Sequence, residues 1–96
     1  MRVYIAGKIS GLQEDAYRKK FADAAECIKN DGHFPINPVD TSHFLLRYDI
    51  QMQVCKLLLS TCDAIYLLDD WHDSKGAIVE KQWAEEMGLA ISFQRG

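Results

Sequence analysis

The stretch that decides the fold of this chain is 67-LLDDWHDSKGAIVE-80. It begins as the end of an apolar strand, crosses a short polar loop and enters a helix. Open α/β folds bind ligands at such turns, at the carboxyl ends of parallel strands. Glu80 falls near the middle of an otherwise apolar helical arc, which consists of Gly76, Ala77, Val79, Trp83, Ala84 and Met87. A carboxylate there is unfavourable unless it is paired or used, so Glu80 is either a functional group or a partly exposed residue that bonds nearby backbone.

Apolar runs and helical patterns alternate along the whole chain. Strands are predicted at residues 2–6, 33–36, 63–68 and 89–93, and helices at about 13–29, 48–60 and 75–87. Pro35 favours an edge position for the second strand. In the second helix, the predicted buried stripe is Ile50, Val54, Leu57 and Leu58. Helical crossovers between apolar strands indicate one α/β domain over residues 1–96, in which a parallel sheet of about four strands, ordered 2-1-3-4, has helices on both faces.

Composition excludes several classes of function. The net charge is −3 and no Lys/Arg cluster occurs, which argues against binding to polymeric nucleic acid. No apolar run approaches the roughly 20 residues that span a bilayer, and no signal-peptide pattern is visible. Cys27, Cys55 and Cys62 lack metal or redox spacing and are predicted to be buried, reduced thiols. A cytoplasmic protein without a metal or other cofactor is expected, because His43 also lacks a partner at metal-ligand spacing.

Polar groups are predicted to converge on the carboxyl edge of the sheet, around the switch point between the first and third strands. The loop after the first strand forms either an anion-binding nest or a plain turn. Asn37 either reaches the site or only forms a turn, and Asp49 either complements its helix dipole or points into the cleft. The predicted binding residues are Gly7, Lys8, Ser10, Gly11, Asn37, Asp70, Trp71, Ser74 and Gly76.

Glu80 and its expected surroundings suit glycosidic chemistry. A carboxylate can attack an oxocarbenium-like carbon while an acidic group assists the leaving group. A tyrosine hydroxyl is a natural donor to orient such a carboxylate, and Tyr4 on the first strand is within reach, although an inward core tyrosine is equally common. Burial would raise the pKa of Glu80 unless a donor offsets it.

Three segments together carry a resemblance to a known family. They are Val3-Tyr4-Ile5-Ala6-Gly7, Asp63-Ala64-Ile65, and Ser74-Lys75-Gly76-Ala77-Ile78-Val79-Glu80 followed by Ala84 and Gly88. In this order and spacing they resemble the nucleoside 2-deoxyribosyltransferases, and more closely a short branch beside them with a Trp before the Ser-x-Gly-Ala segment. The resemblance implies a flavodoxin-like fold and cleavage or transfer at the N-glycosidic bond of a 2-deoxynucleoside or its 5′-monophosphate.

The resemblance also implies roles for individual residues. Glu80 matches the nucleophile, Tyr4 the tyrosine that orients it, and Ser74 a phosphate-binding position, while Asp49 best matches an aspartate that contacts the base or sugar. The chain departs from the family at Lys8, at Asp69-Asp70 and at Ala77, and it lacks a fifth strand.

Two other functions stay open at the level of the sequence. The first is a non-catalytic module that binds a nucleotide or sugar phosphate. The second is an interaction protein that uses the apolar residues 44–46 and Ile78. A homo-oligomer, dimer or larger, is expected in each case, because a small chain gains stability by burying such patches.

Overall fold

Four parallel strands form a single sheet in the computed structural model, which describes residues 1–40 and 47–94. The strand order is β2-β1-β3-β4. Their bounds are β1 Arg2–Ala6, β2 Phe34–Ile36, β3 Ala64–Leu67 and β4 Ala90–Phe93. The predicted sheet order is thus confirmed, as is the edge position of the strand that contains Pro35. His43 and residues 44–46, which entered the predictions on metal binding and oligomerisation, lie outside the described residues.

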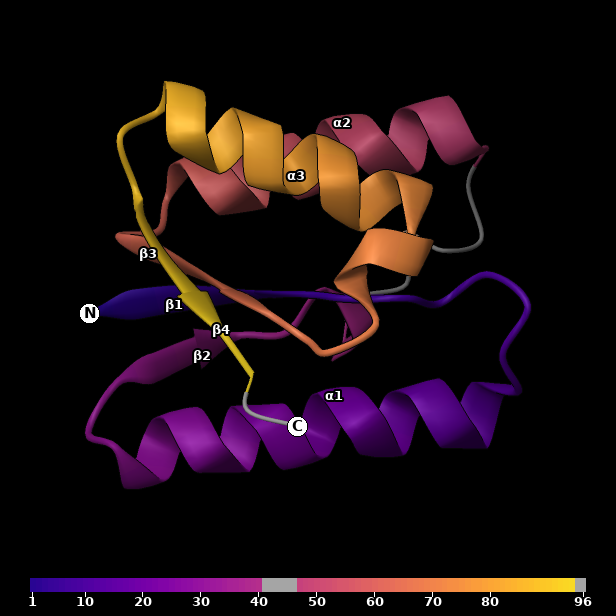
Figure 1. The fold of residues 1–96 in the computed structure, drawn as a ribbon, viewed down its shortest axis with the longest axis horizontal. Coiled ribbons are helices and arrows are strands. Elements are labelled where there is room, and N and C mark those ends of the chain that lie inside the picture. The colour runs from indigo at the N-terminus through magenta and orange to yellow at the C-terminus, as the bar shows by residue number, and fades with distance from the viewer. Residues whose placement is uncertain (41–46, 95–96) are drawn as a thin grey trace.

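Helices cover both faces of this sheet (Figure 1). Helix α1, Glu14–Asn30, lies on one face, while α2, Tyr48–Ser60, and α3, Lys75–Glu86, lie side by side on the other. Two short 3-10 turns, η1 at Pro38–Asp40 and η3 at Trp71–Asp73, complete the described elements. This confirms the three-layer α/β architecture. Within the described ranges, no helix combines the length and the apolar character needed to cross a bilayer.

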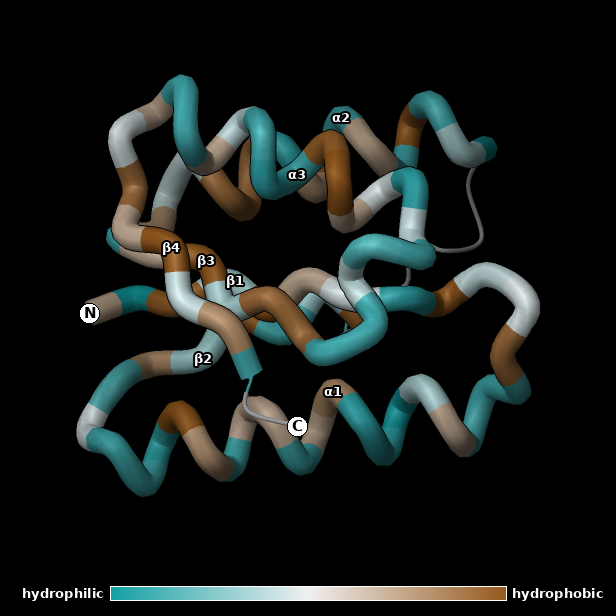
Figure 2. Tube along the Cα trace, in the orientation of Figure 1, coloured by the Kyte–Doolittle hydropathy of each residue, from teal (hydrophilic) through white to brown (hydrophobic). Residues whose placement is uncertain are grey.

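The core consists of two apolar clusters, one on each face of the sheet, because successive strand residues point to opposite faces. On β1, Tyr4 and Ala6 belong to the cluster under α2 and α3, whereas Val3 and Ile5 belong to the cluster against α1. Figure 2 shows the hydrophobic strands running between the more polar helices. Because of this alternation, the Tyr4 side chain lies on the same face of the sheet as α3, the helix that contains Glu80.

Helix α2 is rotated about its axis relative to the prediction. Its buried residues are Cys55 and Leu59, and Leu58 packs against the same cluster, whereas Leu57 is 70% exposed. The predicted burial of Leu57 is therefore wrong. Two apolar stripes on this helix overlap in sequence, and packing against β1 and α3 selects the one with the small Cys55 side chain.

The cysteines are not all buried either. Cys55 and Cys62 are buried, and none of the three cysteines forms a disulfide. Cys27 is exposed, because α1 buries Phe21, Ala24 and Ile28 and turns Cys27 away from that face. The prediction of a buried thiol at Cys27 is wrong.

Candidate active site

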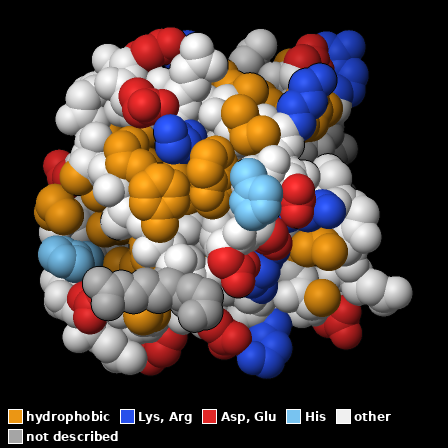
Figure 3. Space-filling view, in the orientation of Figure 1, with side chains coloured by type: hydrophobic (Ala, Val, Ile, Leu, Met, Phe, Trp, Pro, Cys, Tyr) orange, Lys and Arg blue, Asp and Glu red, His pale blue; other side chains and the backbone are white. Residues whose placement is uncertain are grey.

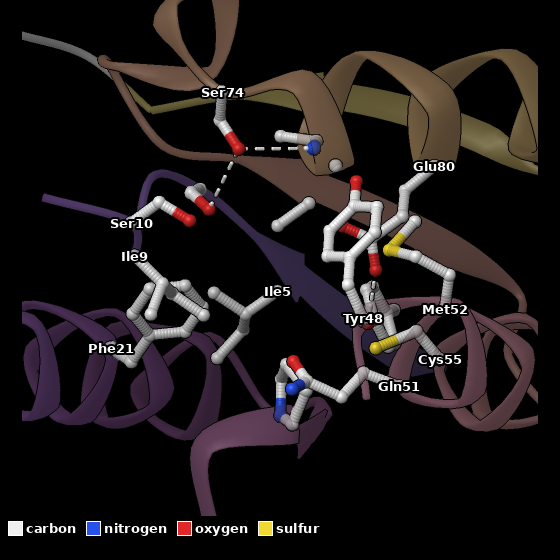
Figure 4. A pocket seen from close by; sticks show the side chains of 16 residues that line it. Ile5, Ile9, Ser10, Phe21, Tyr48, Gln51, Met52, Cys55, Ser74 and Glu80 are labelled. Atoms are coloured by element: carbon white, nitrogen blue, oxygen red, sulfur yellow. Dashed lines mark hydrogen bonds between the residues drawn. The ribbon is translucent and has the colours of Figure 1, made fainter. Parts of the chain in front are cut away.

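A cavity of about 90 Å³ opens at the carboxyl end of β1, between the starts of α2 and α3. Glu80 is the only Asp or Glu among the described residues that line it. Figure 4 shows the cavity with Glu80, Cys55, Met52 and Tyr48 toward one end and Ser10 and Ser74 toward the other. The full lining is Tyr4, Ile5, Ala6, Gly7, Ile9, Ser10, Phe21, Pro38, Tyr48, Gln51, Met52, Cys55, Ser74, Gly76, Ala77 and Glu80.

The Glu80 carboxyl group is buried and hydrogen-bonded. Glu80 is 7% exposed, and the Tyr4 hydroxyl donates a short hydrogen bond to Glu80 Oε2. Cys55 adds a second side-chain hydrogen bond. Burial raises the pKa of Glu80 to about 7, and the bonds from Tyr4 and Cys55 oppose that rise. Near neutral pH this carboxyl group therefore exists in both protonation states.

The two donors keep their own protons at neutral pH. Burial, and then the charge of Glu80, raises the pKa of Tyr4 well above its usual value. The same two causes, in the same order, raise the pKa of the Cys55 thiol to about 12. Of the three groups, only Glu80 titrates in the physiological range.

Ser74 positions the helix that carries Glu80. As the N-cap of α3, its Oγ accepts a hydrogen bond from the Ala77 N–H at 3.1 Å. The same hydroxyl donates to the Gly7 carbonyl at 3.4 Å, which ties the start of α3 to the end of β1. Glu80 lies six residues further along the helix, so the cap and the carboxyl group are parts of one rigid element.

A partly buried ion pair fixes the loop after β1 on the side away from the cavity. Asp70 accepts a hydrogen bond from the Lys8 N–H at 3.0 Å and a short one from Lys20 Nζ. Lys20 Nζ also donates to the Lys8 carbonyl at 2.8 Å. Gly7 packs so closely against Leu68 that an added Cβ would lie 2.6 Å from Leu68 Cδ1. This loop is therefore fixed by α1 and the end of β3, and Asp70 acts behind the cavity instead of lining it.

A second cavity, of about 260 Å³, adjoins the first at the start of α3. It shares Ser10, Tyr48, Ser74 and Gly76 with the Glu80 cavity, and its other lining residues are Lys8, Asp73 and Lys75. A helix start leaves its first N–H groups without intrahelical partners, and here two lysines stand beside them. In the part of the chain that the structure describes, no cluster of three His, Cys, Asp or Glu is arranged to hold a metal ion.

Several predicted site residues lie elsewhere. The Asp49 carboxylate is exposed and pairs with Arg47 at 3.2 Å, so it does not point into the cavity. Asn37 Oδ1 accepts a hydrogen bond from the Val39 N–H at 3.0 Å. Asn37 therefore forms a local turn, which was one of the two roles that the sequence left open for it. Gly11 has φ +83° and lines neither cavity. The Trp71 ring contacts Phe93 at a centroid distance of 6.0 Å, outside both cavities.

The residues that the sequence analysis missed lie on α2. Tyr48, Gln51, Met52 and Cys55 all line the Glu80 cavity. Their spacing of three and four residues places them on one helix face, and this is the signal that could have revealed them. The sequence analysis instead assigned the buried side of this helix to the more apolar stripe on a neighbouring face.

Comparisons with known proteins add to this geometry. No curated protein matches the sequence. A structure described as the 2-desoxiribosyltransferase of Leishmania mexicana shares the fold with a TM-score of 0.73 at 18% identity, over 96% of this chain and 62% of that one. The CMP N-glycosidase BcmB of Clostridium botulinum does so with a TM-score of 0.65 at 17% identity, over 97% of this chain and 67% of that one. This chain thus spans less than two thirds of the first of these proteins.

The likeness confirms the predicted nucleoside 2-deoxyribosyltransferase-like fold. At the level of sequence, one family model matches residues 1–93, nearly the whole chain. The chain belongs to the family described as Domain of unknown function (DUF4406).

Proposed function

We propose that this protein breaks the N-glycosidic bond of a 2-deoxynucleoside or its 5′-monophosphate, with Glu80 as the nucleophile. The observation that carries the proposal is the Glu80 carboxyl group, which is buried, hydrogen-bonded by Tyr4 and part of the lining of a cavity at the carboxyl edge of the sheet. The two neighbours of known structure, a 2-desoxiribosyltransferase and a CMP N-glycosidase, support this class of reaction.

The reaction proceeds by two displacements at C1′. A carboxylate oxygen of Glu80 forms a bond to C1′ while the C1′–N bond breaks. The electron pair of the C1′–N bond leaves with the base, and the base then takes a proton from water. A second water molecule then attacks C1′ and loses a proton to solvent, while the bond between C1′ and Glu80 breaks and returns its electron pair to the carboxylate. A second base in place of that water gives transfer instead of hydrolysis.

Tyr4 orients the nucleophile. Its hydroxyl donates to Oε2 of Glu80 from a fully buried position on β1. A buried donor fixes the carboxylate before the substrate arrives, so little reorganisation is needed during the reaction. The bond also favours the ionised form that attacks C1′.

The adjoining cavity suits a 5′-phosphate. The Glu80 cavity, at about 90 Å³, is smaller than the roughly 300–1,000 Å³ of typical ligand pockets, so it takes the sugar end of a ligand only. The second cavity continues from it and places Lys8, Lys75, Ser74 and the start of α3 around one space. Cations and helix N-termini favour anions, and the attraction outweighs the single opposing carboxylate of Asp73 in that lining.

The test is release of free base. The wild-type protein is incubated with a mixture of 2-deoxynucleosides and their 5′-monophosphates, and released bases are measured by chromatography. Glu80→Gln keeps the shape and the hydrogen-bond acceptor but removes the nucleophile, and we expect it to lose at least 10³-fold in rate, on the order of the loss seen when an essential group is removed. Glu85→Gln, on the exposed side of the same helix, is the matched control and should retain activity.

Each outcome has a definite meaning. Base release by the wild type and by Glu85→Gln, but not by Glu80→Gln, supports the proposal and names the substrate. A folded wild-type protein that binds one of these compounds without releasing base would contradict it and favour a non-catalytic binding module.

A further inference from the structure

Cys55 brings a thiol into the wall of the Glu80 cavity. It is 7% exposed and lies on the face of α2 that lines the cavity with Gln51 and Met52. Its side chain hydrogen-bonds to both Glu80 and Tyr4. The labelled side chains of Cys55 and Glu80 turn toward the same space in Figure 4. Three elements, β1, α2 and α3, thus each contribute one group to a single polar contact inside an apolar core.

A purely structural explanation for Cys55 is that a small side chain was needed where α2 approaches β1. Cys62, in the same core cluster, shows what such a thiol does: its Sγ donates to the Leu58 carbonyl at 3.4 Å, a contact within its own segment. Cys55 also bonds to a carboxyl group and a phenol from two other elements. This difference indicates a role for the thiol beyond filling space.

We propose that Cys55 is a positioning residue, whose S–H donates to the Glu80 carboxylate and, together with the Tyr4 hydroxyl, holds it for attack on C1′. The attack rests on the proposed function, whereas the contact between thiol and carboxylate does not. A thiol is a weak donor, so it orients the carboxylate without stabilising its charge as strongly as a hydroxyl would. Burial raises the pKa of Glu80 to about 7, and the bonds from Tyr4 and Cys55 both oppose that rise.

The other groups that face Glu80 do not obscure this effect. They are Tyr4 from β1 and Cys55 and Tyr48 from α2. Burial raises the pKa of each of these groups, and the charge of Glu80 is the second cause for all three. All three therefore stay neutral while Glu80 titrates, so its titration reports on donors and burial.

The experiment is a titration of Glu80 in three variants. Protein labelled with ¹³C-carboxyl glutamate is titrated by NMR, and Glu80→Gln identifies the signal. Serine and alanine are nearly equal in size, so Cys55→Ser and Cys55→Ala differ mainly in the donor. We expect the midpoint to rise by roughly one pH unit in Cys55→Ala and to fall below the wild-type value in Cys55→Ser. Cys62→Ala, the matched control, should leave it unchanged.

A thiol that only fills space predicts that Glu80 titrates in Cys55→Ala at the wild-type midpoint, and that result would overturn the proposal. If Cys55→Ala does not fold, Cys55→Val, which is close to Cys in size and also lacks the donor, is titrated in its place: a midpoint above the wild-type value supports the proposal, and one at the wild-type value overturns it.

Activity adds an independent measurement. In Cys55→Ala, kcat/KM for base release should fall about tenfold at pH 6 and recover at high pH, because a midpoint one unit higher leaves about tenfold less carboxylate. Serine should restore the rate. If the wild type releases no base, the proposed function fails, but the NMR titration still decides whether Cys55 positions Glu80.

Discussion

The Glu80 carboxyl group lies between three elements, and its protonation state is coupled to folding. Its pKa is about 7 in the folded protein, against an ordinary value of 4.5, because burial disfavours the charge. Between these values the folded chain binds a proton that the unfolded chain has released. Stability must therefore fall as the pH rises from about 4.5 to about 7 and then level off. The ionised Glu80 that the proposed reaction requires therefore destabilises the folded protein. Such a loss of stability in exchange for activity is common at active sites.

Replacing Glu80 by Gln should relieve this effect. The amide cannot ionise but can still accept from Tyr4, so the free energy of unfolding of Glu80→Gln relative to wild type should increase from pH 5 to pH 8. The increase over this pH range should be roughly 2–3 kcal/mol, from linkage with an ordinary pKa of 4.5 and a folded pKa of about 7. Urea denaturation at both pH values measures it. Glu85→Gln should show no such increase, and an equal pH response of the two variants would contradict the burial of a charge at Glu80.

At the scale of the element, the start of α3 performs two tasks. Ser74 caps the helix and joins it to the end of β1 through the Gly7 carbonyl, and it lines both cavities. The helix needs this cap because its first N–H groups have no partners within the helix. Helix stability and the geometry of the proposed phosphate site therefore depend on the same side chain.

Two substitutions at Ser74 separate these tasks. Ser74→Ala should lower the free energy of unfolding by about 1 kcal/mol, because the cap is lost. Ser74→Asn is a good cap and should retain most of that stability. If Ser74 also binds phosphate through its hydroxyl, both variants should raise the KM for a 5′-monophosphate more than for the nucleoside. An alanine variant as stable as wild type would show that the cap contributes nothing.

At the scale of the whole molecule, the Lys20–Asp70 pair joins helix α1 to the loop that follows β3, near the site. Lys20 belongs to α1 and Asp70 follows β3, and both bond the backbone of Lys8 in the loop after β1. The two side chains are only 22% and 25% exposed, so solvent screens this pair less than a surface pair. The loop beside Glu80 is therefore held by a helix on the opposite face of the sheet.

Removal of this pair should destabilise the protein more than removal of a surface pair. We expect Lys20→Met to lower the free energy of unfolding by about 2 kcal/mol, because Asp70 loses a partly buried charged partner. Lys19→Met is the matched control one residue away. Lys19 pairs with Asp23 at 77% and 64% exposure, and its loss should change stability by less than about 0.5 kcal/mol. Thermal or urea denaturation of both variants tests the expectation, which equal effects would refute.

One face of the molecule shows hydrophobic side chains gathered near β4 and η3 (Figure 3). Trp71 and Phe93 contact each other there, and Lys81 Nζ lies 5.5 Å from the centre of the Trp71 ring. Trp71, predicted to bind substrate, instead belongs to this surface. The homo-oligomer expected from the sequence stays a prediction.

The order of the elements and the parallel sheet follow from local signals in the sequence, and so does the prediction that Tyr4 and Glu80 face each other. Apolar runs that follow Gly32 and Gly88 are local signals, and the handedness of strand–helix–strand crossovers leaves few topologies. Strand alternation then places Tyr4 on the face under α2 and α3, and helical periodicity turns Glu80 inward. Backbone geometry therefore directs both side chains toward the same face, whereas the family resemblance implied their roles.

The tertiary structure alone decided which side chains surround Glu80. A rotation of α2 by about one residue, roughly 100°, exposes Leu57, leaves Asp49 on the surface with Arg47 and carries Cys55 and Gln51 to the cavity. Local sequence does not choose between two overlapping apolar stripes on one helix. Close packing against β1 and α3 makes that choice, and it places the stripe with Cys55 beside Tyr4 and Glu80.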